Sequence, residues 1–165
     1  MIHPLSPLGV IHTVISLVPI IAGIYGFIRY HMIDTSKLSG KIYLISLALA
    51  VITSFGVSST GGLNEGHAVG VLILIIAFGS LLVPKIKFLG KLRPYLSVLG
   101  LSLSFFLSLV PGVNETLTRL PVTHPLASAP LASPIPQVLS VLFILFIVGY
   151  ITQCVMIHWN NSKKV

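Results

Sequence analysis

Histidine is the residue type in this chain whose chemistry the sequence brings forward first. The chain has six histidines, and imidazole is the commonest protein ligand for transition metals and also ligates haem iron. His12 lies about one turn inside the first long apolar stretch, and His67 opens another. His124 lies in a proline-rich segment, and Glu65 precedes His67 by two positions. These four residues are the candidates for a site at one face of a membrane.

Two alternative cofactors fit these candidates. His12 and His67 are the two nitrogen ligands that a haem b needs in its axial positions. Together with His124 and Glu65, they offer the nitrogen and oxygen ligands of a zinc or copper site. An imidazole inside a membrane span needs a hydrogen-bonding partner, and we expect His12 to find it on another helix, with His67 as the best candidate. Either site would give the protein a redox or metal-handling function.

The composition decides what kind of element must position these side chains. Of the 165 residues, 55% are hydrophobic and only 8% are charged, with a mean hydropathy of +1.02. A soluble domain carries about 25% charged residues, and disordered chains are poor in hydrophobic ones. A single cysteine excludes a disulfide scaffold and a four-cysteine metal site. We therefore expect a polytopic membrane protein.

Five apolar stretches approach or reach the roughly 20 residues that a helix needs to cross the hydrocarbon core. They are residues 8–28, 40–57, 66–83, 94–110 and 135–157. Pro111 and Gly112 predict the end of the fourth helix, because both residues disfavour its continuation. Residues 113–133 then form an outer loop, in which Asn114 could cap a short helix. The sequence thus predicts an all-α polytopic membrane helical bundle of five transmembrane helices in a single domain.

The basic residues predict how this bundle is oriented. If there are five spans, Arg119 lies on one side and the other nine of the ten basic residues lie on the opposite side. By the positive-inside rule, the N-terminus is outside and the C-terminus is in the cytoplasm. The net charge of +7 is then a topology signal with some attraction to the lipid bilayer. Nucleic acid is not an expected partner, because the charges are scattered over short loops.

Small residues line single faces of these stretches and support a second function. Gly100 and Ser104 belong to one such face of the fourth stretch, and helices in lipid associate through small residues and shared hydrogen bonds. We expect both to point into the bundle and Leu101 to contact lipid. The alternative function is a non-enzymatic membrane subunit or accessory protein that packs against a partner or forms a homo-oligomer. A small-solute transporter is the weaker alternative. A proton or ion path is not expected, because the spans lack the ionisable groups that such paths usually carry.

The first half of the chain carries a set of residues at characteristic positions. They are His12, Gly23, Phe27, Arg29, Gly40, Lys41, Tyr43, Gly61, Gly62 and Gly66. In these residues the chain resembles, over roughly residues 12–80, a group of uncharacterised bacterial predicted membrane proteins. The resemblance implies a small protein of the cell inner membrane.

Overall fold

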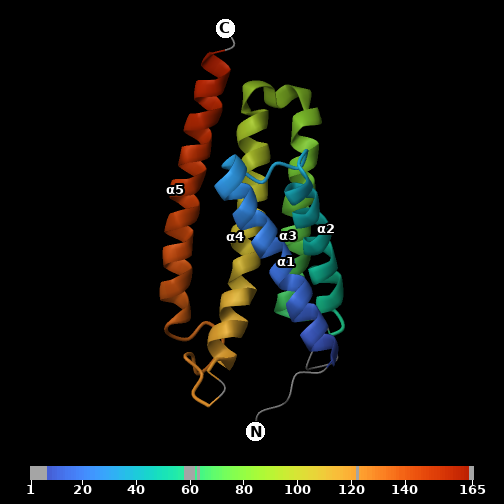
Figure 1. The fold of residues 1–165 in the computed structure, drawn as a ribbon, viewed down its shortest axis with the longest axis vertical. Helices are drawn as coiled ribbons and strands as arrows, with labels where there is room; N and C mark the ends of the chain where they lie inside the picture. Colours follow the sequence, from blue (N-terminus) through green and yellow to red (C-terminus); the bar gives the residue numbers. More distant parts are fainter. Residues whose placement is uncertain (1–6, 58–61, 63, 122, 164–165) are drawn as a thin grey trace.

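The chain forms a bundle of long helices. The structure is a computed structural model, and it describes residues 7–57, 62, 64–121 and 123–163. These residues form helices and connections and no β-strand (Figure 1). The α-helices are α1 (Pro7–Tyr30), α2 (Leu38–Ser54), α3 (Glu65–Leu82), α4 (Arg93–Arg119) and α5 (Ile135–Ser162), and the short 3₁₀ helices η1 (Val83–Lys85) and η2 (Lys87–Leu92) connect α3 to α4.

Four of these helices are long and apolar enough to cross a membrane, namely α1, α3, α4 and α5. The fifth, α2, is also apolar but has only 17 residues. At 1.5 Å per residue it is about 25 Å long, which lies near the lower limit for a spanning helix. The prediction of an all-α bundle of five helices is confirmed.

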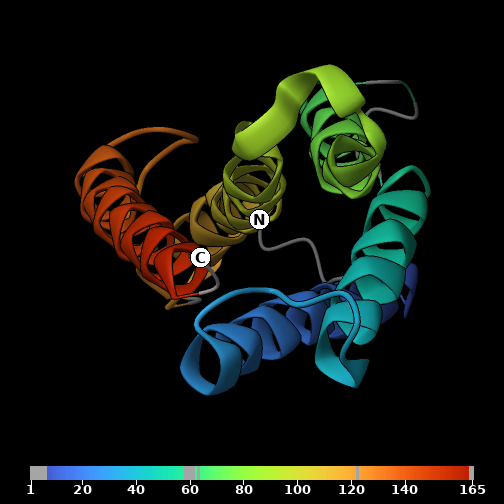
Figure 2. The same cartoon turned by 90° about the horizontal axis from the view of Figure 1, so that it is seen from above.

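The helices are arranged as two antiparallel pairs with one added helix. α1 packs against α2 and α3 packs against α4, while α5 packs against α4. Seen from above, α1 to α4 surround a common interior, and α5 lies beside α4 at the edge of the molecule (Figure 2). This arrangement gives α4 neighbours on several sides.

The shortest α-helix, α2, contributes most to the interior. Seven residues of α2 are buried, among them Tyr43, which has no exposed surface. By contrast, Ile135 and Gln153 are the buried residues of the 28-residue α5. The main hydrophobic cluster consists of Ala22, Ile33, Tyr43, Leu44, Leu47, Ile73, Ala77 and Leu101.

The fourth helix is longer than the sequence predicts. It continues through Pro111 to Arg119, so the prediction that Pro111 and Gly112 end it was wrong. Proline removes one backbone N–H donor, and helices in membranes tolerate that loss. The connection to α5 is therefore residues 120–134 rather than 113–133. Asn114 does not cap a new helix, and its side-chain oxygen accepts a hydrogen bond of 3.0 Å from the Leu131 N–H.

The small-residue face of α4 points inward, as predicted. Ser104 has no exposed surface, and a Cβ added to Gly100 would lie only 2.6 Å from the Cβ of Ser80 on α3. The expectation that Leu101 contacts lipid was wrong, since this side chain is 5% exposed and belongs to the main cluster. α4 is packed on more than one side, so a residue next to its small-residue face can also be buried.

Candidate functional site

His67 is held from both sides by hydrogen bonds. Its Nδ1 accepts a hydrogen bond of 3.0 Å from the Asn64 N–H, and its own N–H donates to the Asn64 side chain at 3.2 Å. Because Nδ1 is an acceptor, the ring proton is on Nε2, which donates to the Ser54 carbonyl oxygen at 3.1 Å. The ring is buried and stacks on Phe55 with a centroid distance of 4.6 Å. His67 thus caps the start of α3 and ties it to the end of α2.

His12 is also bound to the end of α2. Its Nδ1 lies 2.9 Å from the Thr53 Oγ1. The Thr53 hydroxyl donates its proton to the carbonyl oxygens of Leu49 and Ala50, at 2.8 and 3.0 Å. The His12 Nδ1–H is therefore the donor in the His12–Thr53 bond. The expected partner from another helix exists, but it is Thr53 and not His67.

The two histidines therefore form hydrogen bonds with neighbouring residues, Thr53 and Ser54, at the end of α2. We call His12, Thr53, Ser54, Phe55 and His67 the α2-end cluster. Through it α1 is linked to the Thr53 side chain and α3 to the Ser54 backbone. The α2-end cluster joins α1, α2 and α3 at the end of α2.

The predicted metal site is not assembled in the structure. In the described part of the chain, no group of three or more His, Cys, Asp and Glu side chains is placed to hold a metal ion. Glu65 is exposed at the start of α3, and His124 is exposed in the connection between α4 and α5. The set His12, His67, His124 and Glu65 therefore has no support as a metal site.

The haem alternative has no support from the geometry of His67 either. An axial ligand needs a nitrogen with a free lone pair. The Nδ1 lone pair of His67 accepts the Asn64 N–H, and the Nε2 proton is donated to Ser54. In this arrangement neither nitrogen of His67 is available to iron.

A second polar connection, which the sequence reasoning did not assign, links α5 to the bundle. The Ser102 hydroxyl donates to the Gln153 Oε1 at 2.9 Å, and the Gln153 Nε2 donates to the His31 carbonyl oxygen at 2.8 Å. His31 follows α1 with a left-handed φ of 61°, a conformation common just past helix ends. A single amide inside an apolar helix must find partners in a membrane, and this signal at Gln153 could have predicted the contact.

The third connection lies in the centre of the main cluster. The Tyr43 hydroxyl lies 2.8 Å from the Ser104 Oγ, and both side chains are completely buried. Ser104 donates its own proton to the Leu101 carbonyl oxygen at 2.8 Å, so Tyr43 is the donor in the pair. In the described residues, Ser39 Oγ is the one buried side-chain polar atom without a partner. The Tyr43–Ser104 pair thus joins α2 to α4 in the interior.

The comparisons with known proteins add no relative to this picture. No family model, no curated protein and no solved structure matches the chain. The resemblance of residues 12–80 to bacterial membrane proteins stays a prediction.

Proposed function

We propose that this protein is a non-enzymatic subunit or accessory protein of the cell inner membrane. In this proposal it packs against a partner membrane protein or a second copy of itself. The observation that carries the proposal is the position of α5, which is attached to the bundle along one side and leaves most of its apolar surface uncovered (Figure 2).

The polar interior supports this function over a redox or metal-handling one. The histidines of the α2-end cluster, the Tyr43–Ser104 pair and the Gln153 connection each join side chains or backbone groups of different helices. Their N–H and O–H donors are used within the bundle. Such pairs stabilise one arrangement of helices, which is what a packing subunit requires.

The outer face of α5 is suited to pairing with another helix. Five exposed β-branched residues follow alternating spacings of three and four positions, with exposed fractions between 56% and 60%. This period of 3.5 residues keeps one stripe of side chains against a neighbour in a left-handed pair of helices, and most membrane bundles have this geometry. The residues are Val141, Ile144, Val148, Ile151 and Val155.

Disulfide cross-linking in native membranes tests this proposal. Cys154 is the one cysteine of the chain, so Cys154→Ser gives a background into which Val148→Cys is introduced. If the fixed neighbour is a second copy of the chain, two Val148→Cys thiols give up two protons and two electrons to the added oxidant and form one disulfide-linked dimer. If the neighbour is a different protein, a benzophenone attached to the Val148→Cys thiol should capture it on illumination as one discrete species. Ile21→Cys is the matched control, since Ile21 lies on α1 and is 66% exposed. Equal cross-linking at both positions, or none at Val148, would overturn the assignment of α5.

The absorption spectrum and metal content of the purified protein test the proposal that it has no redox or metal-handling function. We expect neither a Soret band nor stoichiometric zinc or copper. A Soret band that disappears in His12→Ala would contradict the proposal and favour the haem alternative. Stoichiometric metal that is lost in the same variant would favour the metal-handling alternative.

A further inference from the structure

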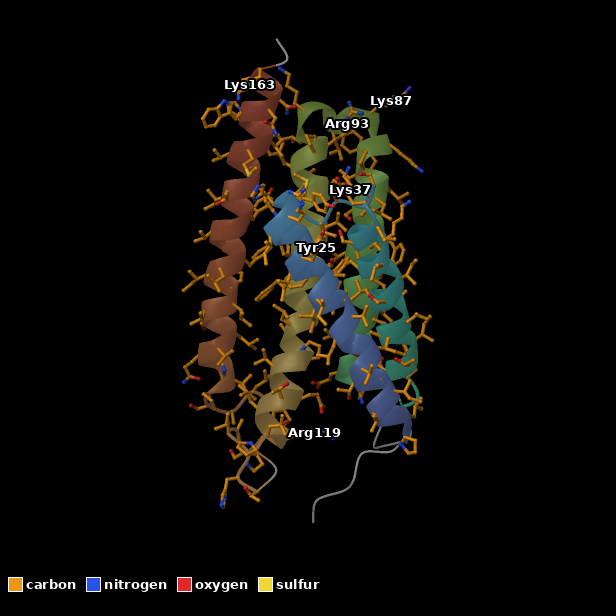
Figure 3. The ribbon with its side chains drawn as sticks, in the orientation of Figure 1. Tyr25, Lys37, Lys87, Arg93, Arg119 and Lys163 are labelled. Carbon is orange, nitrogen blue, oxygen red and sulfur yellow. The ribbon has the colours of Figure 1, made fainter. Side chains whose placement is uncertain are left out.

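A cationic hollow lies at one end of the cleft between α4 and α5. Its volume is about 980 Å³, and Lys91, Arg93 and His158 are among the residues that line it. None of the described residues that line it is acidic. Lys87, Arg93 and Lys163 all lie toward this end of the bundle, whereas Arg119 lies at the opposite end (Figure 3). The hollow therefore combines space with positive charge.

The Arg93 guanidinium is fixed at this hollow and still has free donors. Its Nε donates to the Gly90 carbonyl oxygen at 2.9 Å, and its Nη1 donates to the Pro84 carbonyl oxygen at 3.2 Å. A guanidinium has five N–H donors, so three remain for another acceptor. Lys91 is exposed beside it. These groups suit a phosphate, which accepts several charge-assisted hydrogen bonds.

An apolar groove continues the same cleft toward the middle of the bundle. Its volume is about 570 Å³, and it is lined by side chains of α1, α4 and α5 that include Phe27, Phe105, Phe106 and Phe146. The hollow and the groove follow one another along each helix. Val98 lines the hollow and Ser102 the groove, and Ile157 lines the hollow and Gln153 the groove. Each pair is four residues apart, which is about one helical turn.

The groove begins at a distance from Arg93 that is close to the depth of one lipid leaflet. The groove begins at Ser102 on α4, nine residues after Arg93, which is about 14 Å along the helix. Half of the hydrocarbon core of a bilayer is about 15 Å. A molecule with its charged end beside Arg93 and an apolar chain of leaflet length would therefore reach the start of the groove.

We propose that this cleft binds one anionic phospholipid, with its phosphate in the cationic hollow and an acyl chain along the apolar groove. The charge of the hollow selects an anionic headgroup, and basic pockets between membrane helices are known to bind such headgroups. The apolar groove selects a lipid rather than a free phosphate. This site lies between α4, α5 and α1, so it does not depend on the outer face of α5 or on the proposed function.

The test measures lipid binding to the full-length protein in detergent. The probes are palmitoyl-oleoyl phosphatidylglycerol and the phosphatidylcholine with the same chains, followed by native mass spectrometry and thermal unfolding. We expect one phosphatidylglycerol to be retained and to raise the unfolding temperature, and phosphatidylcholine to do neither. Equal binding of the two lipids would overturn the proposal.

Two protein variants that change the proposed headgroup site, and one control variant, make the test specific. Each basic residue near an anionic headgroup contributes about 1 kcal/mol, so Lys91→Gln should weaken phosphatidylglycerol binding about 5-fold and Lys91→Gln with Arg93→Gln about 30-fold. If the double variant does not fold, Lys91→Gln alone decides, because its side chain is exposed. Arg119→Gln at the other end of the bundle should leave binding unchanged. Equal losses in Lys91→Gln and Arg119→Gln would refute a localised site.

A separate variant tests whether the apolar groove binds an acyl chain. A Cβ added at Gly149, which lines the groove, would meet no atom within 4 Å. Gly149→Leu should therefore fold and occupy the groove, and it should weaken phosphatidylglycerol binding. Glycerophosphoglycerol, the headgroup without chains, should bind much more weakly than the lipid. If that headgroup alone raises the unfolding temperature as much as the lipid does, the site binds a free phosphodiester and the acyl-chain assignment is wrong.

Discussion

His67 occupies the third position of α3, where a glutamate or glutamine commonly reaches back to the N-cap amide. Here the imidazole Nδ1 accepts the Asn64 N–H instead. An imidazole that accepts at Nδ1 carries its proton on Nε2, and this proton is donated to the Ser54 carbonyl oxygen. One neutral side chain thus satisfies a donor of α3 and an acceptor of α2. A carboxylate at this position could not donate the second bond.

Replacing His67 should destabilise the bundle without changing its metal content. In His67→Ala the Asn64 N–H loses its partner and the Ser54 carbonyl oxygen keeps only the Val57 N–H. Each lost hydrogen bond contributes about 0.5–1.5 kcal/mol. We expect a lower unfolding temperature in detergent. His67→Gln should recover part of the loss, because glutamine can complete the N-terminal cap. His124→Ala, at an exposed loop position, is the control, and an equal effect of both alanine variants would contradict a structural role for His67.

The Tyr43–Ser104 pair should respond unequally to removal of its two partners. Tyr43→Phe removes a donor, but Ser104 still donates to the Leu101 carbonyl oxygen. Ser104→Ala leaves the completely buried Tyr43 hydroxyl without its acceptor. Because hydrogen bonds between membrane helices contribute about 0.6 kcal/mol on average and up to about 1.7, we expect a small loss for Tyr43→Phe and a larger one for Ser104→Ala. Thermal unfolding of both variants in one detergent measures the difference. The reverse order would show that the direction of the bond is wrong.

At the scale of helices, the hydropathy of the sequence predicted the apolar middle of each helix more accurately than the residues at which the helix ends. The predicted span 8–28 corresponds to α1 (Pro7–Tyr30), and 66–83 corresponds to α3 (Glu65–Leu82). α4 and α5 extend nine and five residues beyond the predicted 94–110 and 135–157. Their last turns are polar, with Glu115 and Arg119 forming an ion pair on α4. Hydropathy measures the length that fits in hydrocarbon, whereas a helix can continue into the polar interface.

The candidate site was predictable only in part, because the sequence shows that a polar side chain needs a partner but not which residue supplies it. A polar side chain inside a span must have a partner, and this correctly required one for His12. The sequence does not say which neighbouring helix supplies it, because threonine and serine of α2 are as suitable as His67. For Leu101, the periodicity of α4 indicated that the side chain lies next to the small-residue face. It did not indicate that α4 is packed on more than one side, which is why Leu101 is buried. Identification of partners needs the arrangement of the helices.

Gly40 should tolerate a side chain less well than Gly79 does. A Cβ at Gly40 would collide with the backbone of Asp34 in the turn before α2, whereas a Cβ at Gly79 would meet nothing within 4 Å. Alanine is favoured over glycine in a helix by about 1 kcal/mol. We therefore expect Gly79→Ala to keep or raise the unfolding temperature and Gly40→Ala to lower it, because backbone must move. Equal behaviour of the two variants would mean that the α1–α2 turn is looser than the structure shows.

At the scale of the whole molecule, charge and packing are both asymmetric. The labelled basic residues Lys87, Arg93 and Lys163 lie toward one end of the bundle, and Arg119 lies at the other (Figure 3). α5 lies at one edge, and the cleft that it lines together with α1 and α4 ends at the basic end of the bundle in the cationic hollow. The proposed partner surface and the proposed lipid site therefore occupy different faces of the same helix.

The orientation of the molecule in the membrane is the prediction that this asymmetry makes most directly. Nine of the ten basic residues belong to the end that contains the α1–α2 turn, the α3–α4 connection and the C-terminus in a five-span chain. The positive-inside rule places this end in the cytoplasm and the α4–α5 connection outside. We expect an alkaline phosphatase fusion at Ser128 to be active and one after Val165 to be inactive, with the opposite result for green fluorescent protein. Activity of both phosphatase fusions would mean that α5 does not cross the membrane. An active fusion after Val165 with an inactive one at Ser128 would mean that the bundle is inverted, and the cationic hollow would then face the outer leaflet.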